Sequence, residues 1–279
     1  MAAMLRTRFH ARLIVLILGL VLPAGAHPRE SRQTAVQAGT QKESNAYERL
    51  RSEVDPAAKM KLIDGFAADF PESELLAYVY QEGVTLGRRA NSVEIMADYG
   101  AKSLALWPDN YALRTELGSV YVQRDRVDEA ETQAARALEL LAIAEKPETI
   151  GEVQWETTRR TLLASNHQTL GFVHLRRAQA GQDASLRKAE AEAAIRSFRL
   201  SLEFRPIDDF TYYGLGFACG ILNNYADAEA SLARSVAING VVVSGARMLL
   251  EEIYRSRHNQ SLSGLSRVIA AAKAEFGIR

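Results

Sequence analysis

The chain has 279 residues, and its 34 lysine and arginine residues are balanced by 34 aspartate and glutamate residues, so the formal net charge is zero. This balance argues against a nucleic-acid-binding protein, whose surface is basic, and against a polybasic membrane-surface protein. Cys219 is the only cysteine. Because one cysteine cannot form a disulfide within the chain, packing must supply the stability.

The first 26 residues have the pattern of a secretory signal peptide. Three arginines precede the almost wholly apolar stretch 13–22, and Ala24-Gly25-Ala26 supplies small residues for cleavage. An uncleaved membrane anchor is the alternative, but a membrane span needs about 20 apolar residues. We therefore expect cleavage after residue 26 and export to the periplasm or out of the cell. The mature chain would carry 31 basic and 34 acidic residues.

The segment 27–43 is rich in Gln, Arg, Ser, Thr and Gly and lacks an apolar period, which predicts a disordered spacer. From residue 44 to the end, apolar residues spaced three and four apart predict helices, and strand patterns are nearly absent. Pro71, Pro108 and Pro206 separate these helices into pairs. The predicted pairs cover 44–71, 72–108, 109–142, 147–206, 207–240 and 241–279.

In chain order, the first helices are predicted over 43–54, 56–70, 74–86 and 91–106, with Gly87-Arg88-Arg89 as the turn before the fourth. A regular pair follows over 111–142 with its turn at 123–126. The next pair is stretched: a long helix over 147–179 is followed by a turn at 180–183. The last two pairs are predicted over 209–240 and 245–278, and the final turn is predicted at 257–261.

The pair over 111–142 combines small and large residues at fixed positions. Leu117, Gly118 and Tyr121 lie on the face of its first helix, and Ala130 and Ala137 lie on the second. This pattern resembles the tetratricopeptide repeat family, which has a 34-residue helix-turn-helix unit. The pair over 209–240 has a similar pattern. In the pair over 111–142, Arg114 replaces the tryptophan that is typical of the family. The resemblance implies an all-α, right-handed solenoid of about six stacked repeats, beginning near residue 44.

In the family, the first helices of the repeats line a concave groove that binds a protein or peptide partner. The resemblance therefore implies a set of groove residues on the first helices. These are Tyr78, Thr115, Ser119, Gln168, Phe172, Arg176, Phe210, Tyr213 and Phe217. Aromatic residues exposed in a groove anchor peptides. The alternative is that Phe172, Phe210 and Phe217 pack against neighbouring helices.

No motif for nucleophilic catalysis, phosphate binding or a metalloprotease occurs in the sequence. His167 and His174 lie seven residues apart on one predicted helix, but a third metal ligand at one-turn spacing is missing. We expect no enzymatic activity, cofactor or metal, and no nucleic-acid partner. The leading hypothesis is an exported, non-catalytic scaffold for a protein or peptide. The alternatives are an architectural envelope-assembly component and an accessory subunit of an exported enzyme.

Overall fold

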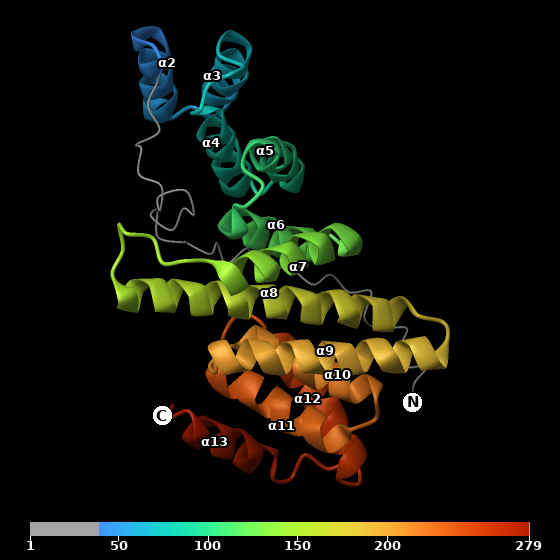
Figure 1. Cartoon of the computed structure of the whole chain (residues 1–279). Coiled ribbons are helices and arrows are strands. Elements are labelled where there is room, and N and C mark those ends of the chain that lie inside the picture. Colours follow the sequence, from blue (N-terminus) through green and yellow to red (C-terminus); the bar gives the residue numbers. More distant parts are fainter. Residues whose placement is uncertain (1–38, 279) are drawn as a thin grey trace.

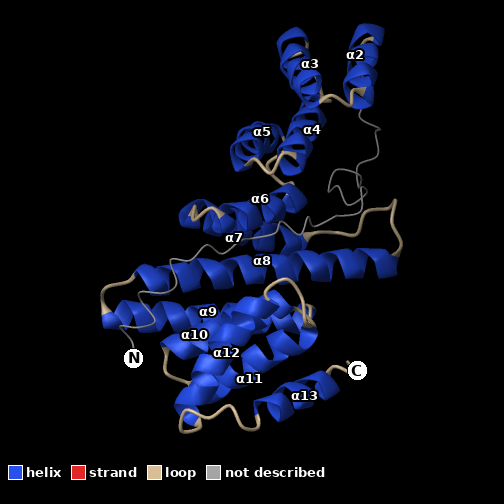
Figure 2. Ribbon diagram, turned by 180° about the vertical axis from the view of Figure 1, so that it is seen from behind, coloured by secondary structure: helices blue, strands red, loops and turns tan. Residues whose placement is uncertain are grey.

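The computed structural model describes residues 39–278, so the predicted signal peptide and residues 27–38 of the expected spacer lie outside the described part. All the regular elements within 39–278 are helices (Figure 1, Figure 2). In chain order they are α2 (Gln41–Ser52), α3 (Pro56–Asp69), α4 (Leu76–Arg89), α5 (Val93–Leu106), α6 (Tyr111–Gln123), α7 (Val127–Ile143), α8 (Glu152–Ala180), α9 (Ala184–Phe204), α10 (Asp209–Ile221), α11 (Tyr225–Ile238), α12 (Val243–Arg257) and α13 (Leu265–Glu275).

The helices form stacked pairs. α4 packs against α5, α6 against α7, α8 against α9 and α10 against α11. The pairs are joined through contacts of α7 with α8, α9 with α10 and α11 with α12. The last unit is different, because α13 packs against α11. The all-α solenoid of stacked helix pairs that the sequence predicts is confirmed.

Three turns within the pairs share one backbone geometry. Asn91, Asp125 and Asn223 have positive φ angles of 53°, 61° and 58°. In each turn, the next residue donates its N–H to the carbonyl five positions before it, which is the bond of a Schellman motif. The donors and acceptors are Ser92 to Gly87, Arg126 to Tyr121 and Asn224 to Cys219. Asn91 and Asp125 are 34 positions apart (125 − 91), so the backbone of these two units repeats with the expected period.

The left-handed conformation at Asn91 gives a testable prediction. Asn91→Val is expected to lower the free energy of unfolding by about 1–2 kcal/mol, because a branched Cβ is crowded at positive φ, whereas Asn91→Gly should be neutral or slightly stabilising. Urea-induced unfolding measures both. At the neighbouring Ala90, φ is −80°. The glycine variant at this position should therefore be no more stable than the valine variant. The same preference for glycine over valine at both positions would contradict the assigned turn.

The pairs end at prolines for a local steric reason. Phe70, Trp107 and Arg205 each precede a proline and leave the helix with φ of −135°, −134° and −135°. A proline disfavours the α conformation in the residue before it. The second helices α3, α5 and α9 therefore stop at the same kind of position.

The predicted turn at Gly87-Arg88-Arg89 is wrong. α4 continues to Arg89, and the turn lies at 90–92. Gly87 is buried, and a Cβ added there would lie 2.7 Å from the backbone nitrogen of Met96 in α5. The glycine therefore permits a close helix–helix approach, and the turn has the same length as the turn after α6.

Several helices start at positions that differ from the prediction, α2 and α8 among them. α2 starts at Gln41, within the expected spacer, because the Thr40 side chain accepts a hydrogen bond from the Glu43 N–H and so caps the helix. The Glu43 carboxylate in turn accepts from the N–H of Gly39 (2.6 Å) and from the Ser73 hydroxyl. α8 starts at Glu152 instead of Pro147.

Candidate partner-binding face

The candidate site is the surface formed by the first helices of the units, α4, α6, α8 and α10, which we call the first-helix face. α6 contacts α8, α8 contacts α10, and α10 contacts α12. All nine residues that the family resemblance places in the groove lie on these four helices. Their side chains are nevertheless in different environments in the two halves of the face.

The aromatic residues of the C-terminal half are packed inside the protein. Phe172 is 8% exposed, and its ring lies 4.9 Å from Phe198 and 4.5 Å from Phe210. Tyr213 is 6% and Phe217 is 8% exposed, and their rings are 6.5 Å apart. Phe210 is half-buried. These aromatic side chains therefore pack against neighbouring helices, which is the alternative to a role in the groove. Little of their surface is available to a partner.

Thr115 is a buried link between two units. Its hydroxyl accepts a hydrogen bond from Asn166 Nδ2 (2.7 Å) and donates to the Tyr111 carbonyl (2.8 Å). Asn166 is fully buried on α8 and also donates to the carbonyl of Leu162 (2.8 Å). Sequence reasoning missed Asn166, because nothing in its local pattern places it opposite Thr115. The pair fixes how α8 lies on α6.

Gln168 has a comparable structural role at the next junction. Its Nε2 donates to Thr211 Oγ1 (2.7 Å) and to Asp208 Oδ1 (3.1 Å). Asp208 caps α10 by accepting from the Thr211 N–H (2.7 Å), and it pairs with Arg205 (2.5 Å). The amide of Gln168 therefore holds α8 on the start of α10.

The N-terminal half of the face offers more accessible polar side chains. Ser119, Thr85 and Gln123 are half-buried on α6 and α4, and none of these three forms a side-chain hydrogen bond with another described residue. Gln81 lies one turn before Thr85, and its buried Nε2 lacks a hydrogen-bond acceptor among the described residues. Thr85 and Ser119 are 34 positions apart (119 − 85), so they occupy equivalent places in neighbouring units.

The other two candidates lie at the edges of this surface. The ring of Tyr78 lies 5.6 Å from the ring of Trp107. Arg176 is half-buried, and its Nε lies 3.7 Å from Asp125 Oδ1, in the turn after α6. Arg176 therefore reaches from α8 towards the N-terminal half of the face.

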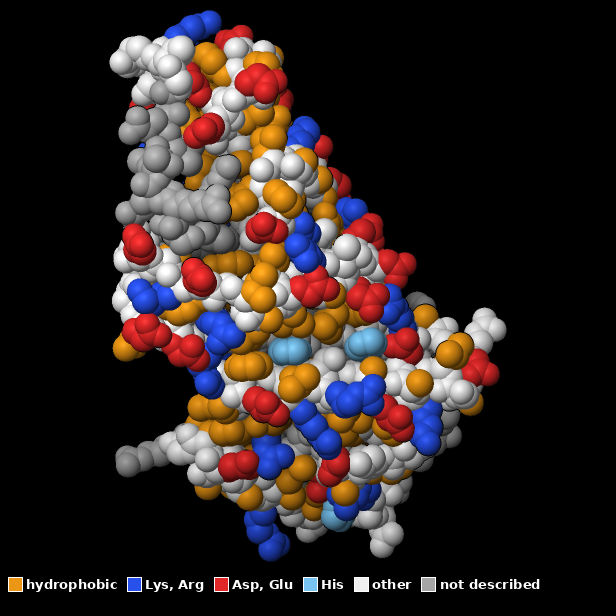
Figure 3. All heavy atoms as spheres, in the orientation of Figure 1, with side chains coloured by type: hydrophobic (Ala, Val, Ile, Leu, Met, Phe, Trp, Pro, Cys, Tyr) orange, Lys and Arg blue, Asp and Glu red, His pale blue; other side chains and the backbone are white. Residues whose placement is uncertain are grey.

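Two glutamates in the N-terminal half of the first-helix face form ion pairs with basic residues. Glu116 lies 2.6 Å from Arg88, and Glu82 lies 2.8 Å from Lys59. Burial raises the pKa of Glu116, although the adjacent guanidinium of Arg88 acts in the opposite direction. The Arg88–Glu116 pair fastens α4 to α6. Figure 3 shows acidic and basic side chains interspersed over one side of the molecule, as the neutral composition predicts.

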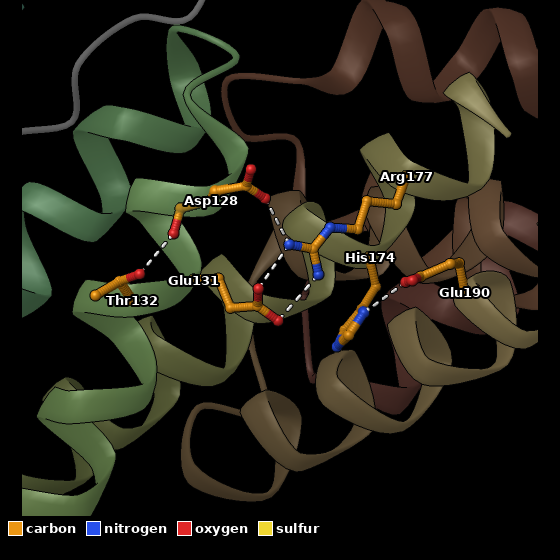
Figure 4. A network of polar contacts seen from close by, with 6 residues as sticks. All are labelled: Asp128, Glu131, Thr132, His174, Arg177 and Glu190. Carbon is orange, nitrogen blue, oxygen red and sulfur yellow. Dashed lines mark hydrogen bonds and ion pairs between the residues drawn. The ribbon is translucent and has the colours of Figure 1, made fainter.

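A second network fastens α7, α8 and α9 together (Figure 4). The guanidinium of Arg177 donates to both carboxylate oxygens of Glu131 (3.0 and 2.6 Å) and to Asp128 (2.8 Å). These hydrogen bonds lower the pKa of Glu131 and raise that of Arg177. His174 Nδ1 lies 2.7 Å from Glu190 Oε2 on α9. Arg177 thus joins α8 to α7, and His174 joins α8 to α9, so these charged groups have a structural role.

The two histidines of α8 have separate environments. The His167 ring stacks on Phe204 with a centroid distance of 5.9 Å, and burial lowers its pKa. His174 instead pairs with Glu190. Within residues 39–278, no group of three or more His, Cys, Asp or Glu side chains is placed to hold a metal ion. None of the described helices combines the length and the apolar character that a membrane crossing requires.

Comparisons with known proteins find similarity among solved structures. No protein-family model matches the chain, and no curated protein matches it. Among solved structures, the chain is similar to a tetratricopeptide repeat protein from Parabacteroides merdae ATCC 43184, at 13% identity and a TM-score of 0.36. The match covers 84% of this chain and 99% of that one. The fold description rests on the chain's own helix packing and repeated turns.

Proposed function

We propose that the chain is an exported, non-catalytic scaffold that binds a protein or peptide along the N-terminal half of the first-helix face, on α4 and α6. Export is supported by the basic, apolar and small-residue pattern of residues 1–26. The binding role is supported by accessible polar side chains that the fold itself does not use. The packed aromatics of α8 and α10 hold the scaffold's shape.

The unpartnered amide of Gln81 is the observation that carries this proposal. A buried donor without an acceptor costs about 1–3 kcal/mol, and a ligand that supplies the acceptor would remove this cost. Gln81 and Thr85 share one face of α4, because residues four apart on a helix are neighbours. Ser119 holds the position on α6 that is equivalent to Thr85 on α4. A main-chain carbonyl of an extended peptide is the acceptor that fits a row of amide and hydroxyl groups.

Site-specific photo-cross-linking tests the location of the partner. A photoreactive amino acid at Thr85 is expected to capture a partner when the full chain is produced in its native cells. The same amino acid at Ala101, which is exposed on α5, serves as the control. Identical captured proteins at both positions, or none at Thr85, would contradict the proposal.

A stability measurement on Gln81 gives an independent prediction. Gln81→Leu is expected to raise the free energy of unfolding by about 1 kcal/mol, because it removes an unpaired buried donor, and to weaken binding of the cross-linked partner about tenfold. Gln123→Leu, also on the first-helix face, should produce no such gain in stability. If Gln81→Leu destabilises the protein, the amide is satisfied in solution and the argument for a ligand acceptor fails.

A further inference from the structure

The N-terminal end of α8 extends beyond its pair partner. α8 has 29 residues and α9 has 21, a difference of eight (29 − 21). In the neighbouring pairs the second helix is at least as long as the first, with 13 and 17 residues for α6 and α7. Arg160 Nη2 donates to the carbonyls of Glu203 (3.1 Å) and Phe204 (3.2 Å), at the end of α9. Residues 152–159, which we call the overhang, therefore extend past α9 (Figure 1).

One side of the overhang is covered and the other is open. Trp155 is 5% exposed, and its ring lies 6.4 Å from Tyr111 of α6. With Ile150 and Leu141 these rings belong to a small core between α6, α7 and α8. On the open side, Val153 is 81% exposed, and Ile143 at the end of α7 is 80% exposed. These two aliphatic side chains, one before and one after the linker 144–151, therefore leave apolar surface open to solvent.

Unpaired carboxylates accompany the exposed aliphatic residues. Four exposed glutamates lie between residues 145 and 156, and none of them forms a hydrogen bond or ion pair with another described residue. They are Glu145, Glu148, Glu152 and Glu156. Acidic side chains, with fewer basic ones, gather in Figure 3 at the projecting edge where Figure 1 places the α7–α8 linker and the start of α8.

The nearby cations are directed towards the protein itself. Lys146 Nζ lies 3.4 Å from the Pro147 carbonyl and 3.2 Å from that of Ile150. Arg159 Nε donates to the carbonyl of Leu141 (3.4 Å), and Arg160 caps α9 as described. Residues 145–160 hold four glutamates and three cations, a formal net charge of −1. The glutamates are the charged groups of this segment that lack a partner among the described residues.

We propose that the overhang, together with Ile143 and the linker 144–151, is a second docking surface that binds a basic amphipathic helix of a protein partner. Eight helical residues span about 12 Å, or two helical turns, which suits two aliphatic anchors one or two turns apart on the partner. Lysine or arginine residues beside these anchors would meet the four carboxylates. A second copy of this chain is a poorer occupant, because a two-fold contact would place the same carboxylates opposite each other.

A model helix tests this surface directly. The probe is a labelled synthetic peptide with leucine on one face and lysine on the other, titrated with the full chain in fluorescence anisotropy. Val153→Gln is expected to weaken binding about tenfold, because an aliphatic contact is lost. A triple variant is expected to weaken peptide binding about fivefold and to make the affinity depend less on salt concentration. Its substitutions are Glu145→Gln, Glu148→Gln and Glu156→Gln. Glu152 is retained because an acidic residue stabilises the first turn of a helix.

Matched variants elsewhere give the controls. Met248→Gln removes another exposed apolar side chain, and Glu72→Gln/Glu74→Gln/Glu252→Gln removes three other exposed carboxylates. Both should leave the affinity unchanged, and circular dichroism melting checks that every variant is folded. Equal losses in the control variants would overturn the proposal, because binding would then follow charge or hydrophobicity in general.

Two further measurements distinguish other occupants. Hydrogen exchange of the complex is expected to show new protection within residues 143–160. Protection on α4 and α6 instead would overturn this proposal, while the proposed partner-binding role of the first-helix face would stand. Sedimentation should show no self-association that depends on Val153. Self-association that Val153→Gln abolishes would make a second copy the occupant and would also overturn the proposal.

Discussion

Phe198→Ala is expected to lower the free energy of unfolding by about 3–5 kcal/mol, the range for truncating a fully buried phenylalanine. The ring is 0% exposed and lies between two glycines. A Cβ on Gly171 of α8 would lie 2.5 Å from its Cε1, and a Cβ on Gly214 of α10 would lie 2.5 Å from its Cζ. Removing the ring therefore leaves a cavity where α8, α9 and α10 meet. Urea-induced unfolding measures the loss.

The same contact predicts a compensating pair of substitutions. Gly171→Ala alone is expected to cost about 1–3 kcal/mol, because the added methyl group overpacks the site. Combined with Phe198→Leu, which leaves more room, it should cost clearly less than the sum of the two single variants. Strict additivity would show that the ring and the glycine are not in the contact that the structure gives them.

Arg88→Met is expected to cost on the order of 3 kcal/mol at neutral pH, because it leaves the carboxylate of Glu116 in a protein environment without its partner. Arg88 Nη2 lies 2.6 Å from Glu116 Oε1, and the Glu116 side chain is only 15% exposed. The two residues connect α4 to α6. Removing the guanidinium therefore weakens the junction between the first two regular units.

The cost of Arg88→Met should depend on pH. Burial raises the pKa of Glu116 above its ordinary value of 4.5 even with Arg88 present. A carboxyl group with a raised folded-state pKa binds its proton more tightly when folded, so it destabilises the protein as pH rises above 4.5. Without Arg88 the folded-state pKa rises further, and stability should fall more steeply between pH 4.5 and 7.

Unfolding curves at several pH values, with a matched variant, check this prediction. Glu116→Gln in the Arg88→Met background removes the titrating group and should abolish the additional pH dependence. An equal loss of stability at pH 4 and pH 7 would contradict the role assigned to Glu116, because the cost would then come from lost packing of the arginine stem.

The ends of helices could be predicted from the sequence where the terminating residue has only one structural effect. The prolines after Phe70, Trp107 and Arg205 force the preceding residue out of the helix, so the ends of the units were predictable. Gly87 was misassigned because a glycine can either break a helix or let a second helix approach. Only its contact with Met96 distinguishes the two.

The candidate site was less predictable, because exposure depends on how neighbouring units pack. The family pattern places Ser119, Phe172 and Phe217 at equivalent positions on successive first helices, yet the two aromatic residues are buried and the serine is accessible. Asn166, which holds α8 to α6, carries no sequence signature. The overhang was also missed, because it depends on where α9 ends relative to α8 and not on any property of α8 alone.

The length of α8 has a consequence for how this protein unfolds. Trp155 and Leu162 belong to the small core beside α6 and α7, whereas Phe172 and Val173 belong to the main hydrophobic core, whose buried residues run from Leu50 of α2 to Ala272 of α13. Solenoids often melt unit by unit from their ends, because each unit contacts only its neighbours. Here the two cores share one uninterrupted helix, so neither can come apart without breaking it or displacing part of the other. α8 thus makes the centre of the chain one cooperative unit, and the terminal units are left as the places where unfolding begins.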